Sequence, residues 1–218
     1  MARIESELLN YSSKYKYDNG VLINLLNIRD QNSLDKVERN LTNLKLSQLY
    51  DNPNLSLKGS SKFTVNHYLE IHKFLFDKIY PFAGEIRSEA IKKTIPFCLP
   101  NFIYSNLNEI MKKMYKYANR VNSRDDLLNF IVYFYPVLDL IHPFMEGNGR
   151  CEREFFRQYI KHICDNNLDK EYYLDFSLIE DKNDFINAVI DADVCADENH
   201  LRNVFDKILI ESSNELKK

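Results

Sequence analysis

The most informative stretch of the chain reads LLNFIVYFYPVLDLIHPFMEGNGRCER and spans residues 127–153. Its first part, residues 127–141, is apolar almost all round, and a helix with this pattern is buried on every side. Ser123 with Asp126 three residues later resembles a capping box, which predicts where this helix begins. Pro143 ends the helix at the preceding residue, because a residue before proline disfavours helical backbone angles. The stretch therefore predicts a buried central helix.

Amphipathic patterns outside this stretch predict that most of the chain is helical. Apolar residues recur three or four positions apart after a capping residue or a proline. By this criterion helices begin near Ser33, Thr64, Pro100, Arg150 and Ser177, and a last helix contains Leu201 to Leu209. Pro136 is expected to bend the buried helix or stop it briefly. Residues 81–100 break the helical period, so we expect an all-α fold with one short β-hairpin.

Length and charge limit the kind of protein that the chain can be. Its 218 residues suit one domain or two small ones. Lysine and arginine total 29 and aspartate and glutamate 32, and this formal charge of −3 argues against a protein that coats DNA. No apolar run reaches the roughly 20 residues of a membrane span, and the polar N-terminus lacks a signal-peptide core. We expect a cytoplasmic protein that binds no membrane, with its four cysteines as free thiols.

The segment after the buried helix carries residues suited to phosphate chemistry. Gly147 and Gly149 can adopt positive φ angles, which lets successive backbone N–H groups point inward as an anion-binding nest. The helix that begins near Arg150 adds its partly positive N-terminus to the same place. Residues 147–149 therefore predict a cradle for phosphate.

Side chains on either side of the cradle extend it. Glu146 supplies a hard oxygen ligand of the kind that Mg²⁺ takes together with substrate phosphates. Arg150 and Arg153 are three residues apart, so they share a helix face, and guanidinium groups suit phosphate oxygens. Together these groups can hold a triphosphate. His142 has neither a metal-ligand partner nor a Cys or Ser nucleophile at motif spacing, so we interpret it as a general base.

This segment resembles a known family. Residues 142–153, HPFMEGNGRCER, look like the full signature of Fic-domain proteins, with every fixed position filled. Residues 80–87, YPFAGEIR, are similar to the segment that leads into the family's flap, and residues 20–39 resemble the N-terminal part of toxin-type members. The resemblance implies a Fic-type helical bundle with a β-hairpin flap over residues 56–218. A helical extension over residues 1–55 would pack on this core.

The resemblance also implies an activity. Fic-type enzymes of this kind are protein adenylyltransferases, which use ATP and Mg²⁺ to attach AMP to a Ser, Thr or Tyr hydroxyl of a target protein. Carried over to this sequence, His142 would deprotonate that hydroxyl. Glu146 would hold the metal ion between the α- and β-phosphates.

The remaining motif residues would bind the nucleotide. Gly147, Asn148 and Gly149 would cradle the phosphates, with the Asn148 side chain on the α-phosphate. Arg150 and Arg153 would hold the β- and γ-phosphates, and pyrophosphate would leave. The implied role of these five residues is thus to orient the α-phosphorus for attack.

The resemblance further implies two kinds of protein partner. The flap would bind the target's backbone as an added strand, through Lys92, Lys93, Thr94, Ile95, Pro96 and Phe97. Self-inhibited members carry a Ser/Thr-x-x-x-Glu-Gly/Asn helix, which residues 105–110 and 194–199 match only in part. We therefore expect a toxin-type member whose inhibitory glutamate comes from a separate small antitoxin and reaches Arg153. A bacterial type II topoisomerase subunit is the expected target class, without direct contact to nucleic acid.

Other functions stay open at this point. The same histidine can transfer another group, such as UMP or phosphate-linked choline, because the motif says little about the donor. A catalytically idle module that binds nucleotide or a partner is the second alternative, although it would not need His142. A kinase branch of the superfamily has lysine in place of the second motif glycine, and Gly149 argues against that branch.

Several residues outside the motif have plainer interpretations. His72 lies on an apolar helix stripe and is expected to belong to the core. His162 and Cys164 are two residues apart but lack the further ligands of a structural zinc site. Arg157 is expected to pair with Glu154 rather than to bind the nucleotide.

Overall fold

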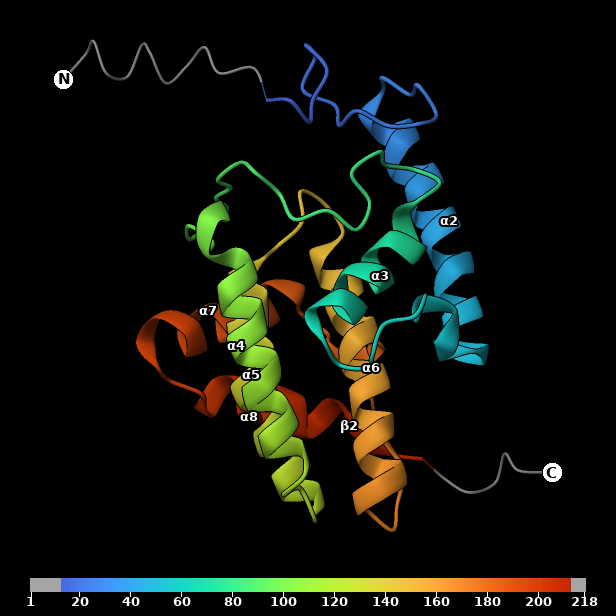
Figure 1. Ribbon diagram of the computed structural model, residues 1–218. Helices are drawn as coiled ribbons and strands as arrows, with labels where there is room; N and C mark the ends of the chain where they lie inside the picture. The colour runs from blue at the N-terminus through green and yellow to red at the C-terminus, as the bar shows by residue number, and fades with distance from the viewer. Residues whose placement is uncertain (1–12, 213–218) are drawn as a thin grey trace.

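The computed structural model describes residues 13–212, and this part of the chain is mostly helical (Figure 1). Its seven α-helices are α2 (Gln31–Asp51), α3 (Val65–Phe76), α4 (Pro100–Ala118), α5 (Arg124–Ile141), α6 (Asn148–Asn167), α7 (Lys182–Cys195) and α8 (Asn199–Ile208). The shorter elements are two 3-10 helices and two strands, η1 (Pro53–Ser56), η2 (Phe176–Leu178), β1 (Tyr172–Leu174) and β2 (Leu209–Glu211). The predicted all-α class is confirmed, with a small two-stranded sheet added to it.

Helix α5 lies at the centre of the bundle, because its apolar side chains point in nearly every direction. It packs against α4, α6, α7 and α8. As predicted, Ser123 caps it by accepting a hydrogen bond from the N–H of Asp126. The helix runs through Pro136 without interruption, so the stop that this proline suggested does not occur. The end of α5 at Ile141 therefore holds the following motif on a buried element.

The helices beside α5 form the rest of the core. Helix α3 packs against α6, and α2 packs against α3 on the side of the molecule away from α4 (Figure 1). The predicted N-terminal extension, residues 1–55, includes α2, and its first 12 residues lie outside the described part. The division of the chain after residue 55 stays a prediction.

Three helices begin at residues other than those predicted, and one of them, α6, begins at Asn148 rather than near Arg150. Asp30 rather than Ser33 caps α2, since its carboxylate accepts the N–H of Ser33 at 2.8 Å. Asp181 rather than Ser177 caps α7, and the N–H of Ser177 instead donates to Asp175 at 3.0 Å. Neighbouring Ser and Asp side chains compete for the same cap, so a sequence pattern locates a helix better than its first residue.

Extended backbone occurs at two places. Strands β1 and β2 pair antiparallel, with Tyr172 opposite Glu211. The flap is a hairpin with a single bridge, between Lys92 and Pro96, and the N–H of Lys93 donates to the carbonyl of Ile95 at 3.2 Å. The short predicted hairpin is thus present, whereas the β1–β2 pair was not predicted.

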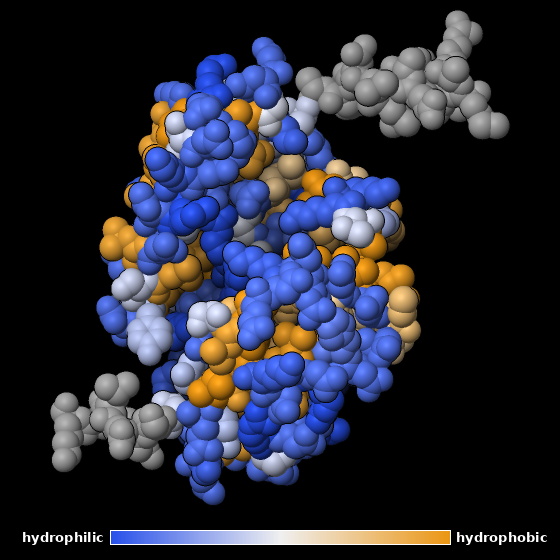
Figure 2. Space-filling model, turned by 180° about the vertical axis from the view of Figure 1, so that it is seen from behind, coloured by the Kyte–Doolittle hydropathy of each residue, from blue (hydrophilic) through white to orange (hydrophobic). Residues whose placement is uncertain are grey.

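The surface is polar over most of the face seen in Figure 2. Apolar side chains appear there in separate patches among hydrophilic ones. Among the described helices, none combines the length and the apolar character needed to cross a lipid bilayer.

Candidate active site

The motif predicted from the sequence occupies the turn between α5 and α6. Gly147 is the N-cap of α6 and has a φ of +79°, a left-handed conformation that favours glycine. A Cβ at this position would lie 2.2 Å from the ring of Phe76, so a larger residue does not fit. Gly149, in contrast, lies in the first turn of α6 and is not among the glycines with positive φ. The expectation of positive φ is therefore right for Gly147 and wrong for Gly149.

His142 is held in one orientation at the C-terminal end of α5. Its Nδ1 lies 3.1 Å from the carbonyl oxygen of Asp139, and its ring stacks on Phe97 of the flap at 3.8 Å between centroids. A carbonyl only accepts hydrogen bonds, so Nδ1 carries the proton and Nε2 carries the lone pair. The side chain is 6% exposed and lines a cavity together with the motif. This is the arrangement that a general base requires.

Arg87 fixes the backbone beneath His142, a role that the sequence did not reveal. Its guanidinium is 1% exposed and donates to the carbonyls of His142 at 2.8 Å and Cys98 at 2.5 Å. The backbone N–H of Arg87 donates to the carbonyl of Pro143 at 2.9 Å. Because Cys98 follows the flap, one buried cation ties the flap to the end of α5. The only sequence signal was its place in the YPFAGEIR segment.

The N-terminus of α6 presents the predicted anion site. Asn148 is buried, and its side chain accepts from the N–H of Phe144 at 2.9 Å and donates to the carbonyl of Phe144 at 2.7 Å. These two bonds close the loop at the start of α6, whose first residues, Asn148 and Gly149, line the cavity. The side chain that was predicted to meet the α-phosphate thus also holds the loop in shape.

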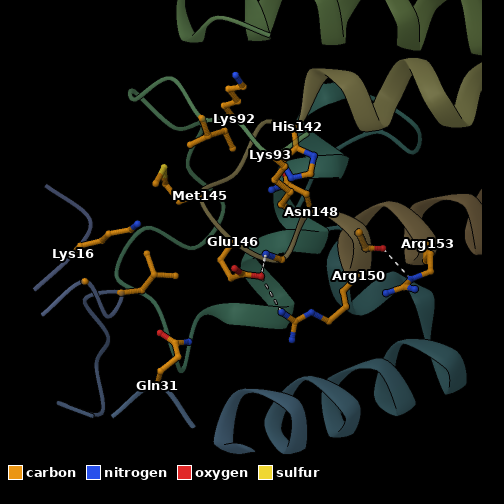
Figure 3. Close-up of a pocket in the computed structure, with 15 residues that line it drawn as sticks. Lys16, Gln31, Lys92, Lys93, His142, Met145, Glu146, Asn148, Arg150 and Arg153 are labelled. Carbon is orange, nitrogen blue, oxygen red and sulfur yellow. Dashed lines mark hydrogen bonds and ion pairs between the residues drawn. The ribbon is translucent and has the colours of Figure 1, made fainter. Parts of the chain in front are cut away.

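The two motif arginines have different surroundings. Arg150 contacts Glu38 of α2, lies 3.3 Å from Thr42 Oγ1 and 3.3 Å from Glu146 Oε1. Arg153 donates from Nε to the carbonyl of Gly149 at 3.1 Å. Within residues 13–212, Arg153 forms no ion pair with a carboxylate. Both arginines line the cavity, and Figure 3 shows the guanidinium of Arg150 directed toward Glu146 and that of Arg153 lying apart from it.

Glu146 has one carboxylate oxygen in use and one available. Its Oε1 accepts the N–H of Gly147 at 2.8 Å and lies 3.3 Å from Arg150. Neither contact involves Oε2, and the side chain is 42% exposed. A single carboxylate oxygen next to a phosphate site suits Mg²⁺, which takes one or two carboxylates and completes its shell with phosphate oxygens and water. The described residues include no cluster of three or more His, Cys, Asp or Glu ligands that would hold a metal without the nucleotide.

His72 supports the motif from behind. It is fully buried, as predicted, and its Nδ1 accepts the N–H of Gly84 at 2.8 Å. Its Nε2 therefore carries the proton and donates to the carbonyl of Glu146 at 2.9 Å. Burial lowers the pKa of His72 to about 3, so the ring stays neutral. This histidine joins the segment before the flap to the backbone of Glu146.

Two cavities meet at His142. The first, of about 500 Å³, is lined by the motif and by residues of the N-terminal segment and the flap, including Lys16, Gln31 and Lys92 (Figure 3). The second, of about 350 Å³, lies between the flap and α7 and shares His142 and Arg153 with the first. Its wall on α7 is mainly apolar and ends in Asp193, whose pKa burial and the nearby Asp139 raise to about 8.

The other candidate residues behave as predicted or play no part in the site. Arg157 pairs with Glu154 at 2.8 Å. Cys164 is buried and accepts the N–H of Tyr172, while His162 contacts Asn166. The four cysteines are free thiols.

Comparison with known proteins agrees with this geometry. Residues 62–160 match the model of the Fic/DOC family. The chain therefore contains a Fic domain, and the Fic-type fold predicted from the sequence is confirmed. Protein adenylyltransferase VbhT of Bartonella schoenbuchensis is 30% identical over 165 residues, which cover 75% of this chain and 32% of VbhT. Probable protein adenylyltransferase y4lH of Sinorhizobium fredii is 28% identical, with 78% of this chain and 82% of y4lH covered.

Solved structures share the fold. The N-terminal Fic domain of a putative cell filamentation protein from Bartonella quintana, with bound ADP, has a TM-score of 0.75 at 22% identity, covering 91% of this chain and 95% of that one. BepC from Bartonella tribocorum, with bound AMPPNP, has a TM-score of 0.72 at 21% identity, covering 91% and 97%. The sequence relatives are named protein adenylyltransferases, which are nucleotidyltransferases, and the chain spans about a third of the length of VbhT.

Proposed function

We propose that the protein transfers AMP from ATP to a hydroxyl side chain of a target protein. The observation that carries this proposal is the position of His142, whose unprotonated Nε2 lies in the same cavity as the N-terminus of α6 and Arg153. A base next to an anion site is what attack of a hydroxyl on a phosphate requires. The names of the sequence relatives and the nucleotides bound in the structural relatives support the same reaction.

In this reaction the target hydroxyl attacks the α-phosphorus. Its oxygen forms a bond to that phosphorus while its proton passes to Nε2 of His142. The bond from the α-phosphorus to the bridging oxygen breaks, and pyrophosphate leaves with the electron pair. The α6 N-terminus and Arg153 stabilise the negative charge that the phosphates carry, so positioning and electrostatics supply most of the catalysis.

The cavity between the flap and α7 is the place for the nucleoside. It is next to the phosphate site, and its α7 wall includes Phe185 and Ile186, which suit the faces of a flat base. The carboxyl of Asp193, which holds its proton near neutral pH, can both donate to and accept from the base's polar edge. We assign ATP as the donor on this basis and on the bound nucleotides of the structural relatives.

Glu146 would hold Mg²⁺ through Oε2. The donor set fits, since this oxygen is free of the contacts that occupy Oε1 and Glu146 lines the phosphate cavity. When bound, the metal ion supplies positive charge for the nonbridging oxygens of the α- and β-phosphates.

The flap is the proposed contact with the target. Its hairpin has only the bridge between Lys92 and Pro96, so most of its backbone groups are available to pair with an extended segment. Phe97 stacks on His142, so a target strand bound along the flap would lie next to the imidazole of His142. A subunit of a bacterial type II topoisomerase, met in the cytoplasm, remains our proposed target class.

A small antitoxin is the proposed inhibitor. Arg153 lacks a carboxylate partner within residues 13–212, and it borders a groove of about 430 Å³ that also contains Leu46, Arg157 and Phe176. The glutamate of the first partial inhibitory motif, Glu109, pairs with Lys113 at 2.7 Å, and within residues 13–212 Glu198 of the second forms no ion pair with Arg153 either. A glutamate on an added helix in this groove would satisfy Arg153 and block the phosphate site.

The reaction is tested with purified protein, Mg²⁺ and ATP labelled at either the α- or the γ-phosphate in a bacterial lysate. We expect label on protein only from α-labelled ATP, lost in His142→Ala and retained in the control variant His162→Ala. Label from the γ-position would contradict AMP transfer. Label from UTP or a choline nucleotide alone would favour the alternative donors, and equal results for wild type and His142→Ala would favour an idle module.

A further inference from the structure

Glu38 of α2 lies behind the active site and connects to it through Arg150. One of its carboxylate oxygens contacts the guanidinium of Arg150, and the other accepts the hydroxyl of Tyr80. Its side chain is 10% exposed and does not line the cavity that contains the motif. Glu38 therefore has no direct access to substrate, and any effect on the reaction passes through Arg150.

Arg150 in turn bridges two carboxylates. Its Nη2 contacts Glu38 on one side. The same nitrogen lies 3.3 Å from Glu146 Oε1 on the other, a contact marked by a dashed line in Figure 3. Its Nη1 lies 3.3 Å from the hydroxyl of Thr42, which itself donates to the carbonyl of Glu38 at 2.8 Å. Glu38 and Thr42 thus hold the two terminal nitrogens of the guanidinium in place. The position of Nη2 in turn sets that of the Glu146 carboxylate.

The charges of this network depend on Glu38. A guanidinium between two carboxylates is held by both of them, whereas loss of one carboxylate leaves it free to turn fully toward the other. The hydroxyl of Tyr80 stays protonated, because burial and the neighbouring Glu38 raise its pKa, so it serves as a fixed donor. Glu38 is consequently held between a permanent donor and a permanent cation.

We propose that Glu38 is a positioning residue that, through Arg150, aims Oε2 of Glu146 at the metal ion. This inference rests on the proposed function and adds α2 to the active site, although α2 lies outside residues 62–160, the region that matches the family model. Groups that orient a metal ligand commonly change metal affinity by about 10- to 100-fold when they are removed.

The first test is metal-dependent nucleotide binding, measured by calorimetry on a His142→Ala background so that no turnover occurs. We expect Glu38→Gln to weaken binding of ATP with Mg²⁺ by about tenfold and to leave binding of ATP in EDTA unchanged within about twofold. Glu109→Gln, a glutamate of α4 whose partner is Lys113, is the matched control and should change neither. Equal affinities of Glu38→Gln and the control with Mg²⁺ would overturn the proposal, as would an equal loss with and without Mg²⁺.

A second variant guards against misfolding of the first. Tyr80→Phe removes only the hydroxyl that orients Glu38, and we expect a weaker loss of the same kind, about threefold. In a Glu146→Gln background, Glu38→Gln should cause no further loss with Mg²⁺, because both residues act on the same ligand. Additive losses in the double variant would overturn the proposal. AMP transfer by wild type tests the proposed function separately, since it does not depend on how the Glu38 variants bind.

Discussion

The carboxylate of Asp139 lies 3.5 Å from Nδ1 of His142, one helical turn earlier on α5. The carbonyl of the same residue lies 3.1 Å from that nitrogen, so a single residue faces the protonated side of the imidazole with two oxygen atoms. In the proposed reaction His142 takes a proton on Nε2 and its ring becomes a cation, which the nearby carboxylate would stabilise. Asp139 is therefore the proposed orienting partner of His142, although it is absent from the motif of residues 142–153.

Asp139→Asn should slow the reaction without weakening ATP binding. The amide keeps the shape of the side chain and removes the charge that stabilises the imidazolium, so we expect kcat to fall by about tenfold or more. The KM for ATP should change less than kcat, because Asp139 contacts no proposed phosphate ligand, although it borders the cavity between the flap and α7. Steady-state kinetics on a purified target or on self-modification measures both. Asp165→Asn, on the exposed face of α6, is the control, and an unchanged kcat for Asp139→Asn would remove this residue from the mechanism.

Gly147→Ala should destabilise the protein, whereas Gly149→Ala should not. The φ of Gly147 is +79° and a Cβ there would meet the Phe76 ring at 2.2 Å, while a Cβ on Gly149 would have only the Arg153 side chain at 3.9 Å. The left-handed conformation alone costs a residue with a Cβ about 1–2 kcal/mol, and the overlap with Phe76 adds to it. Denaturant unfolding of the two variants measures the difference. Equal free energies of unfolding would mean that the loop can shift without cost.

Arg87→Met should destabilise the junction between the flap and α5. The carbonyls of His142, Cys98 and Glu89 would all lose a charged donor, and each such bond contributes about 1.5–3 kcal/mol. Since water can reach part of the junction after the change, we expect a net loss of about 3 kcal/mol in the free energy of unfolding. Arg120→Met, at an exposed position after α4, is the control. A loss no larger than that of the control would show that the carbonyls find other donors.

Asp193→Asn should change how stability depends on pH. Burial and the charge of Asp139 raise the folded-state pKa of Asp193 to about 8, from an ordinary value of 3.8. Between these values the unfolded chain is ionised and the folded one is protonated, so this group lowers stability as pH rises from about 4 to 8. The variant should be as stable as wild type near pH 4 and more stable by about 1–2 kcal/mol at pH 8, after allowance for partial solvent screening.

The measurement is denaturant unfolding of both proteins at pH 5, 6.5 and 8. At each pH, the free energy of unfolding of the variant minus that of wild type reports on Asp193 alone. Contributions of other groups cancel, such as that of His72, whose lowered pKa makes stability rise with pH. A difference that stays constant with pH would mean that Asp193 is ionised in the folded protein.

Much of the fold and the motif could be predicted because both depend on patterns of residues that are close together in the sequence. The apolar run of α5 and the cap at Ser123 depend on residues close together in the sequence, and so does the glycine that caps α6. The contacts that complete the site are of another kind. Glu38 and Arg150 are 112 positions apart, and Arg87 meets His142 from 55 positions away. Neither pair has a periodicity or spacing that a single sequence displays.

The predictions that were wrong or missing also concern contacts that the local sequence does not show. Strands β1 and β2 are three residues each and pair across the chain, so neither shows the alternation of a longer strand. Gly149 was expected in a positive φ conformation because glycine permits it, but the helix that starts at Asn148 already fixes its backbone. Sequence indicates which conformations a residue allows, and packing decides which one it adopts.

The pairing of β1 with β2 makes the segment from η2 through α8 a closed excursion of the chain. Paired strands lie about 4.8 Å apart, so this segment begins and ends at nearly the same point of the molecule. Helix α7, which forms one wall of the cavity beside His142, belongs to this segment. A relative's segment that has the same end-to-end spacing and keeps the packing of α7 and α8 on α5 would fit between Leu174 and Leu209. Donor preference could then be exchanged as a module while the reacting residues on α5 and α6 keep their scaffold.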